Sequence, residues 1–216
     1  NSNAVAELAM GLMLCCARSL PYHFANTKQK LWKNDRNGME LTGKTLGILG
    51  LGAIGKELAK KAAAFGMKVL GYSRHIDESF CKEYGIIPAD RETILQESDV
   101  ISLHMPQTPL TKESINKEAF AQMKKGVILI NTSRGYLVNR ADLVDAIKAG
   151  IVASYGTDVM QEEPPETDDP LFSLDEVVIT PHMGASTEEA HIKMMDVAMT
   201  NALDILEGKA CKNIVN

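Results

Sequence analysis

The sequence contains few cysteines, and their spacing is not typical of a disulfide framework or a metal site. Four cysteines occur among 216 residues, and none of Cys15, Cys16, Cys81 and Cys211 belongs to a CxxC pair. This pattern excludes a disulfide scaffold and favours a reducing compartment. The five histidines lack ligand spacing and do not pair with a cysteine, so no metal site is predicted. We therefore expect a cytoplasmic protein without a bound metal.

An excess of basic residues and a long hydrophobic run are absent as well. The chain has 23 Lys and Arg against 28 Asp and Glu, which gives a net charge of −5 and no broad positive field for a phosphate backbone. The longest apolar stretch, Ala4 to Ala17, contains Glu7 and is shorter than the roughly 20 residues that cross a bilayer. We expect no nucleic acid and no membrane as partner, and a small-molecule function is the better hypothesis.

The composition that remains is typical of a folded domain. Hydrophobic residues make up 45% and charged residues 24% of the chain, close to the globular average. At about 150 residues per domain, the length predicts one domain and part of a second. The chain begins with Asn1 instead of Met, so we expect a fragment or a processed chain.

Short apolar runs alternate with helical periodicity from residue 45 onward. Thr45–Leu49 and Met67–Tyr72 flank a helical segment, Ala53–Phe65, and together they read as a β-α-β unit. Further strands are predicted at Val100–Leu103, Val127–Ile130, Val152–Tyr155 and Val177–Thr180, and further helices around Arg91–Gln96, Ile115–Met123 and Arg140–Ala149. This alternation predicts an α/β fold with a doubly wound parallel sheet of the Rossmann type.

The two ends of the chain are predicted to be helical. A helix from about Ala4 to Ser19 opens the chain and is either core or a subunit interface, and a polar stretch without regular structure follows it to Gly38. Gln161–Leu174, rich in Pro, Asp and Glu, is predicted to be a solvated surface loop. A closing helix spans about Thr187 to Glu207.

The sequence Gly50-Leu51-Gly52-Ala53-Ile54-Gly55 stands between the first predicted strand and its helix. In this context Gly50 permits the tight turn, Gly52 lets a pyrophosphate approach the backbone, and Gly55 lets helix and strand pack closely. The amides of Ala53 and Ile54 open the helix and suit an anion. The alternative is a glycine-rich turn without ligand, but the flanking elements favour a dinucleotide.

The residues that follow the second strand bear on which dinucleotide is bound. An NAD site normally has Asp or Glu about 20 residues after the glycines, and this chain has Ser73-Arg74 there. A hydroxyl and a guanidinium can both donate to a 2′-phosphate, which a carboxylate would repel. NADP(H) is therefore favoured, and NAD(H) remains possible. In the alternative interpretation Arg74 is an ordinary surface residue, or Asp77 reaches the ribose.

Three later strands end in polar residues that the topology should bring together. Arg134, Asp158 and His182 each follow a predicted strand, and ligands of open parallel sheets bind at that edge. Arg134 is either a surface residue or the ligand of a substrate carboxylate. His182 is either a structural histidine or a group that moves a proton where it meets a reacting group. Their convergence at one edge favours the functional interpretation of both. A carboxylate beside His182 would favour its charged form. Glu163 is the first candidate for this carboxylate, and Glu162 is its competitor.

Several motifs in order along the chain resemble the D-isomer-specific 2-hydroxyacid dehydrogenases, with a character closest to the phosphoglycerate dehydrogenase branch. The motifs are Asn1-Ser2-Asn3-Ala4-Val5-Ala6-Glu7, the loop Gly50 to Gly55, Leu103-His104-Met105-Pro106, Asn131-Thr132-Ser133-Arg134-Gly135, Asp158-Val159 with Glu162-Glu163-Pro164-Pro165, and Pro181-His182-Met183-Gly184-Ala185-Ser186-Thr187. The resemblance implies hydride transfer between a nicotinamide cofactor and a D-2-hydroxy acid or its 2-oxo acid.

The resemblance also implies roles for individual residues. Arg134, Glu163 and His182 would be catalytic: His182 exchanges the proton and is paired with Glu163, which directly precedes the loop proline, while Arg134 binds the carboxylate. Asp158 would meet the nicotinamide amide. The further cofactor contacts implied are Met105, Pro106, Thr132, Ser133, Arg134, His182, Gly184 and Ala185, and the substrate contacts are Asn1, Arg134 and His182.

The organisation implied by the resemblance is a coenzyme domain with most of its partner domain missing. Residues 1–186 would form the dinucleotide-binding domain with its opening crossover helix, and residues 187–216 would return toward a substrate domain whose upstream part is absent, so the fragment alone would turn over poorly. The family implies a homodimer. Related corepressors share the fold, so a dinucleotide-sensing interaction module without significant turnover is the alternative function.

Overall fold

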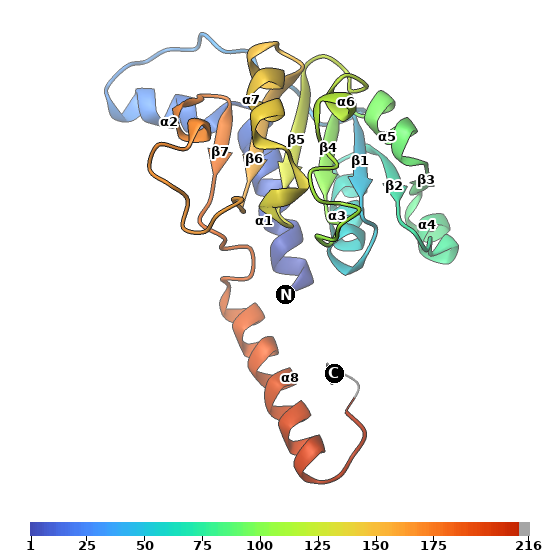
Figure 1. Cartoon of the computed structure of the whole chain (residues 1–216). Coiled ribbons are helices and arrows are strands. Elements are labelled where there is room, and N and C mark those ends of the chain that lie inside the picture. Colours follow the sequence, from blue (N-terminus) through green and yellow to red (C-terminus); the bar gives the residue numbers. More distant parts are fainter. Residues whose placement is uncertain (212–216) are drawn as a thin grey trace.

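A parallel β-sheet forms the centre of the molecule (Figure 1). The computed structural model describes residues 1–211, and its seven strands lie in the order β3-β2-β1-β4-β5-β6-β7. The strands are β1 (Thr45–Leu49), β2 (Lys68–Tyr72), β3 (Ile87–Pro88), β4 (Val100–Leu103), β5 (Val127–Asn131), β6 (Val152–Thr157) and β7 (Val177–Ile179). Every neighbouring pair is parallel. The predicted doubly wound parallel sheet is confirmed.

The strand order reverses in the middle of this sheet. The chain runs outward from β1 to β3, returns to β4 beside β1, and then runs outward again to β7. The connections after β1 and β4 therefore leave toward opposite faces and open a crevice at the carboxyl ends of these two strands.

Helices cover both faces of the sheet. The α-helices of the described residues are α1 (Ser2–Ala17), α2 (Leu20–Lys28), α3 (Ala53–Ala64), α4 (Glu78–Tyr84), α5 (Arg91–Glu97), α6 (Lys117–Phe120), α7 (Arg140–Lys148) and α8 (Glu188–Leu206). One core contains side chains of α1, α3 and α4, and the other contains side chains of α5, α6 and α7. Along β5, Ile128 and Ile130 face the first core while Val127 and Leu129 face the second, as expected for a strand buried on both sides.

The opening helix α1 is part of the core. Ala6, Ala9 and Met13 are fully buried, and the helix packs against α3, β5 and β6. The sequence left open whether this helix belongs to the core or to a subunit interface. The face that packs against α3, β5 and β6 belongs to the core. The tight fit explains the Ala-rich composition, because small side chains let a helix approach a sheet closely.

Two α-helices and one strand were not predicted from the sequence. The polar stretch predicted to be irregular contains α2, which buries none of its residues and so carries no hydrophobic period. The edge strand β3 has two residues, both exposed. Helix α4 could have been predicted from the residues at its two ends. Asp77 caps its first turn by accepting a hydrogen bond from the Phe80 amide, and Gly85 ends it with φ +66°.

Two predicted segments are also corrected. The helix expected over Ile115–Met123 shrinks to α6, because Ile115 pairs with Val138 in a β-bridge and Asn116 caps a helix that begins at residue 117. The acidic loop Gln161–Leu174 is not wholly solvated. It contains a 3₁₀ turn over Pro170–Ser173, and the side chain of Asp169 is buried and accepts a 2.5 Å hydrogen bond from Arg140 Nη1.

The closing helix α8 leads away from the sheet (Figure 1). It begins after Thr187, whose hydroxyl accepts from the Ala190 amide, close to its predicted start, and Ala190 is its one buried residue. Residues 212–216 of the predicted returning tail lie outside the described residues. Within the described part, no single helix is long and apolar enough to cross a membrane, and α1 and α2 reach that length only as a pair bent by 68°.

Candidate functional site

The glycine loop after β1 has the backbone geometry that its three glycines allow. Gly50 has φ +111°, and a Cβ there would lie 2.5 Å from the carbonyl carbon of His104. A Cβ at Gly55 would lie 2.2 Å from the Gly50 carbonyl oxygen, whereas a Cβ at Gly52 would meet nothing within 4 Å. Two of the glycines are therefore required by packing within the protein, and the open space at Gly52 is where a ligand can approach the backbone.

Helix α3 begins at this open position without a side-chain cap. Gly52 is its N-cap residue, has extended backbone and supplies no capping oxygen, and the first turn carries no acidic residue. The amides of Ala53 and Ile54 therefore remain available at the positive end of a 12-residue helix. The pyrophosphate of a dinucleotide fits these donors.

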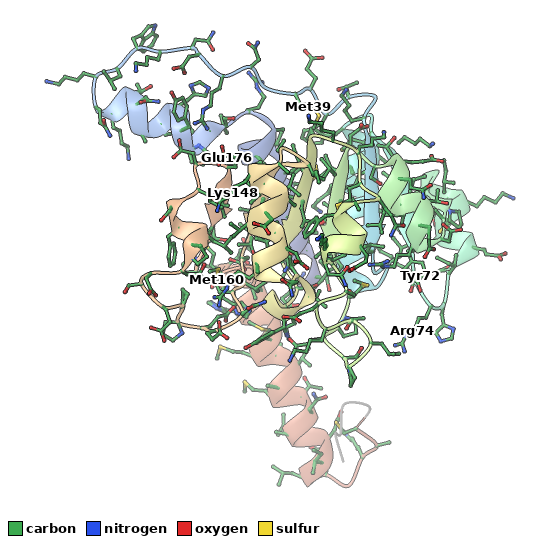
Figure 2. All side chains as sticks on the ribbon, turned by 45° about the horizontal axis from the view of Figure 1, so that its top comes forward. Met39, Tyr72, Arg74, Lys148, Met160 and Glu176 are labelled. Carbon is green, nitrogen blue, oxygen red and sulfur yellow. The ribbon has the colours of Figure 1, made fainter. Side chains whose placement is uncertain are left out.

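A cavity of about 330 Å³ extends from the glycine loop along the ends of β2 and β4. Ser73 and Arg74 form one wall, and Met105 and Pro106 form another. Figure 2 shows Arg74 at the same end of the sheet as Tyr72, the last residue of β2. Four predicted cofactor residues, Ser73, Arg74, Met105 and Pro106, therefore line a single cavity.

Asp77, the alternative ribose ligand, is engaged elsewhere in this structure. Its Oδ2 lies 2.5 Å from Lys56 Nζ, and its Oδ1 accepts from the Ser79 hydroxyl and the Phe80 amide. The hydrogen bond from Lys56, with the two others, holds the pKa of Asp77 well below its usual range. The carboxylate serves to cap α4 and is absent from the cavity lining.

The turn after β5 is organised by Asn131, a residue for which the sequence analysis assigned no role. Its side-chain amide donates to the Arg134 carbonyl at 3.0 Å, and its Oδ1 accepts from the Ser133 amide at 3.0 Å. Ser133 in turn donates its hydroxyl to the Leu103 carbonyl, which joins the ends of β4 and β5. This bracing leaves the Arg134 side chain exposed at the edge of the sheet, with no ion pair among residues 1–211.

His182 and Glu163 form a direct pair. His182 Nδ1 lies 2.6 Å from Glu163 Oε2, and Glu163 Oε1 accepts from the Met160 amide at 3.0 Å. Burial raises the pKa of Glu163, but the hydrogen bonds from His182 and Met160 outweigh it, and the charge of Arg134 acts in the same direction, so that the net pKa is lowered. Glu163 is therefore ionised at neutral pH, and both other predicted catalytic residues, His182 and Arg134, lie within electrostatic reach of it.

Glu162, the competing carboxylate, faces away from this pair. Its Oε1 accepts a 2.7 Å hydrogen bond from the Tyr136 hydroxyl, and its Oε2 lies 3.5 Å from Arg140. These contacts connect the loop after β6 to the start of α7. The choice of Glu163 as the partner of His182 agrees with this geometry.

Asp158 holds the turn that presents His182. Its side chain is 2% exposed; Oδ1 accepts from the Thr180 hydroxyl at 2.6 Å and the Met183 amide at 2.9 Å, and Oδ2 accepts from the Gly184 amide at 2.8 Å. The turn wraps around the carboxylate with His182 at φ +51°, an uncommon conformation for a side-chain-bearing residue. The predicted contact of Asp158 with the nicotinamide amide stays a prediction, and this positioning contact had no signal in the sequence.

The remaining predicted residues differ in their surroundings. Thr132 has a buried hydroxyl without a hydrogen-bond partner among the described residues, and Gly184 is buried against Asp158. Asn1 is not among the residues around His182: its side-chain amide lies 4.0 Å from Met194 Sδ of α8, and both residues line a separate hollow. Its predicted substrate contact stays a prediction. Within residues 1–211, no group of three or more His, Cys, Asp or Glu is placed to hold a metal ion.

These features define a class: a Rossmann-type dinucleotide-binding domain with an imidazole, a carboxylate and a guanidinium at its ligand-binding edge. The family model described as D-isomer specific 2-hydroxyacid dehydrogenase, NAD binding domain, matches residues 10–184. The chain belongs to this family and comprises its coenzyme-binding part.

Several enzymes with different names are similar to this chain. The chain is 42% identical over 218 residues to D-3-phosphoglycerate dehydrogenase of Methanocaldococcus jannaschii, covering all of this chain and 41% of the relative. It is 47% identical over 191 residues to hydroxypyruvate reductase of Thermotoga maritima, covering 87% of this chain and 61% of the relative. The crystal structure of D-lactate dehydrogenase with NAD+ from Lactobacillus jensenii superposes with a TM-score of 0.90 at 30% identity, covering all of this chain and 69% of that one. The chain thus spans about two-fifths of the length of the phosphoglycerate dehydrogenase.

Proposed function

We propose that the protein containing this chain is an oxidoreductase that transfers a hydride between a nicotinamide cofactor and a D-2-hydroxy acid or the corresponding 2-oxo acid. The observation that carries the proposal is the 2.6 Å pair of His182 Nδ1 and Glu163 Oε2. This acid–base pair lies at the edge of the sheet where a dinucleotide would be held, and family membership supports the same chemistry.

Each residue of the trio has a separate task in this proposal. His182 Nε2 donates a proton to the 2-oxo oxygen in reduction and accepts it from the hydroxyl in oxidation. Glu163 orients the ring through Nδ1 and stabilises its protonated form. Arg134 binds the substrate carboxylate with two parallel hydrogen bonds. When bound, the nicotinamide supplies or accepts the hydride.

We also propose that NADP(H) is favoured over NAD(H). Ser73 and Arg74 line the cavity beyond the glycine loop, and Asp77 is occupied by Lys56, so the cavity has no carboxylate that would repel a 2′-phosphate. The cytoplasmic location, the homodimer and the poor turnover of the chain alone remain predictions.

The test is oxidation of NADPH by the intact protein, followed by absorbance over a panel of 2-oxo acids. Turnover with at least one acid, giving the D-hydroxy product, supports the oxidoreductase. Tight cofactor binding without turnover on any acid would favour the corepressor-like sensing module.

The pH dependence of oxidation tests the His182–Glu163 pair. His182 must be neutral to accept the hydroxyl proton, so turnover falls at low pH as the ring becomes protonated. The Glu163 carboxylate stabilises the protonated ring, and Glu163→Gln removes that stabilisation. We expect the acid limb of the kcat profile to move to lower pH in this variant, because the carboxylate that faces His182 Nδ1 is gone.

The neighbouring glutamate is the matched control for this experiment. Glu162→Gln removes the same charge one residue away, but its partners are Tyr136 and Arg140. This variant should leave the acid limb where it is. A shift in Glu162→Gln without one in Glu163→Gln would reverse the assignment.

A further inference from the structure

We infer that Arg91 is a second determinant of cofactor specificity and acts with Arg74 on the 2′-phosphate. This inference rests on the proposed preference for NADP(H). Arg91 is the first residue of α5, 17 positions beyond Arg74 in the sequence, yet both line the cavity that begins at the glycine loop. The parallel β2–β3 pairing explains this, because it brings the start of α5 to the same edge as the end of β2.

Charge in the cavity comes from these two arginines. The lining includes no Asp, Glu or Lys, and no ion pair involves Arg74 or Arg91 among residues 1–211. His104 also lines the cavity, but burial lowers its pKa to about 4, so its ring is neutral near pH 7. Two guanidinium groups facing one hollow without a carboxylate suit a doubly charged anion such as a phosphate monoester.

The carboxylates nearest to Arg91 in the sequence do not cancel its charge by direct contact. Asp90 caps α5 by accepting from the Thr93 amide at 2.7 Å, and hydrogen bonding from Thr93 lowers the pKa of this carboxyl. Glu92 is exposed in the first turn of the same helix. Neither residue lines the cavity.

A hydrogen bond to Ser114, another residue of the cavity lining, fixes the position of Arg91. Arg91 Nη2 donates a 2.5 Å hydrogen bond to the Ser114 carbonyl, which uses one of its five N–H donors. The Ser114 hydroxyl is buried and has no partner among the described residues, and Ser114 lines the same cavity. The Ser114 carbonyl thus holds Arg91 in place, and Arg91 retains other N–H donors for a ligand. The Ser114 hydroxyl lines the same cavity and still lacks a hydrogen-bond partner among the described residues.

The experiment compares two ligands that differ only in the 2′-phosphate. Adenosine 2′,5′-bisphosphate and 5′-AMP are titrated calorimetrically into the wild-type chain and into Arg91→Gln, Arg74→Ala and Lys148→Ala. Gln removes the charge but can still donate to the Ser114 carbonyl. Lys148 is an exposed residue at the end of α7 (Figure 2), so its removal is a matched loss of charge outside the cavity.

We expect Arg91→Gln to weaken the bisphosphate about 10- to 100-fold, the range for a lost charged hydrogen bond, and to change 5′-AMP by less than about threefold. Arg74→Ala should show the same selectivity and Lys148→Ala no effect. If Arg91→Gln loses affinity equally for both ligands, or for neither, the inference about Arg91 is overturned. The Arg74→Ala variant then still tests the proposed preference for NADP(H). A wild-type chain that does not prefer the bisphosphate would instead refute the NADP(H) proposal itself.

Discussion

Replacing His182 by Gln should lower turnover of 2-oxo acid reduction by about 10²- to 10⁴-fold, the usual contribution of a general acid. Glutamine can occupy the turn but cannot deliver a proton at neutral pH. Cofactor affinity should change little, because the cavity and the helix N-terminus that would hold the dinucleotide do not depend on the ring. The measurement is kcat with saturating NADPH, together with a direct titration of NADPH binding.

The control for this loss is His23→Gln on α2, a histidine far along the chain from His182 that does not line the cavity at the glycine loop. It should behave like the wild type in both measurements. Residual turnover of His182→Gln within about tenfold of the wild type would be too high for a proton donor, and the catalytic assignment would fall.

Replacing Asp158 by Ala should both destabilise the domain and lower turnover. The carboxylate accepts from the Thr180 hydroxyl and from the Met183 and Gly184 amides, and these three donors lose their acceptor together. Each buried unsatisfied group costs about 1–3 kcal/mol, so we expect the free energy of unfolding to fall by about 2–4 kcal/mol. The His182 turn should also lose its conformation, which lowers kcat.

A milder variant separates these two effects. Thr180→Val removes a single donor to Asp158 and keeps both amide contacts, so the free energy of unfolding should fall by about 1 kcal/mol with kcat nearly unchanged. Denaturant unfolding and steady-state kinetics on both variants measure the two quantities. If Asp158→Ala keeps the wild-type stability and weakens only cofactor binding, the carboxylate serves the nicotinamide and does not position His182.

The sequence was sufficient to predict the sheet and the phosphate-binding turn because both depend on local spacing. Apolar runs of four to six residues, separated by helical segments, led to six of the seven strands. Two of the three glycines of the loop after β1, Gly50 and Gly55, are required by contacts within the loop or with the adjacent strand end, and Gly52 faces open space. Elements without a buried face, such as α2 and β3, carry no such pattern and were missed.

The contacts of the site were decided by tertiary structure. The sequence favoured Glu163 as the partner of His182 and left Glu162 as its competitor. The path of the loop after β6 turns Glu162 toward Tyr136 and Glu163 toward His182. In the same way, Lys56 forms an ion pair with Asp77, and the β2–β3 pairing places Arg91 on the cavity that Arg74 also lines. Contacts between residues of different loops depend on how distant segments pack against each other. Hydrophobic periodicity predicts helices and strands but not the paths of the loops between them.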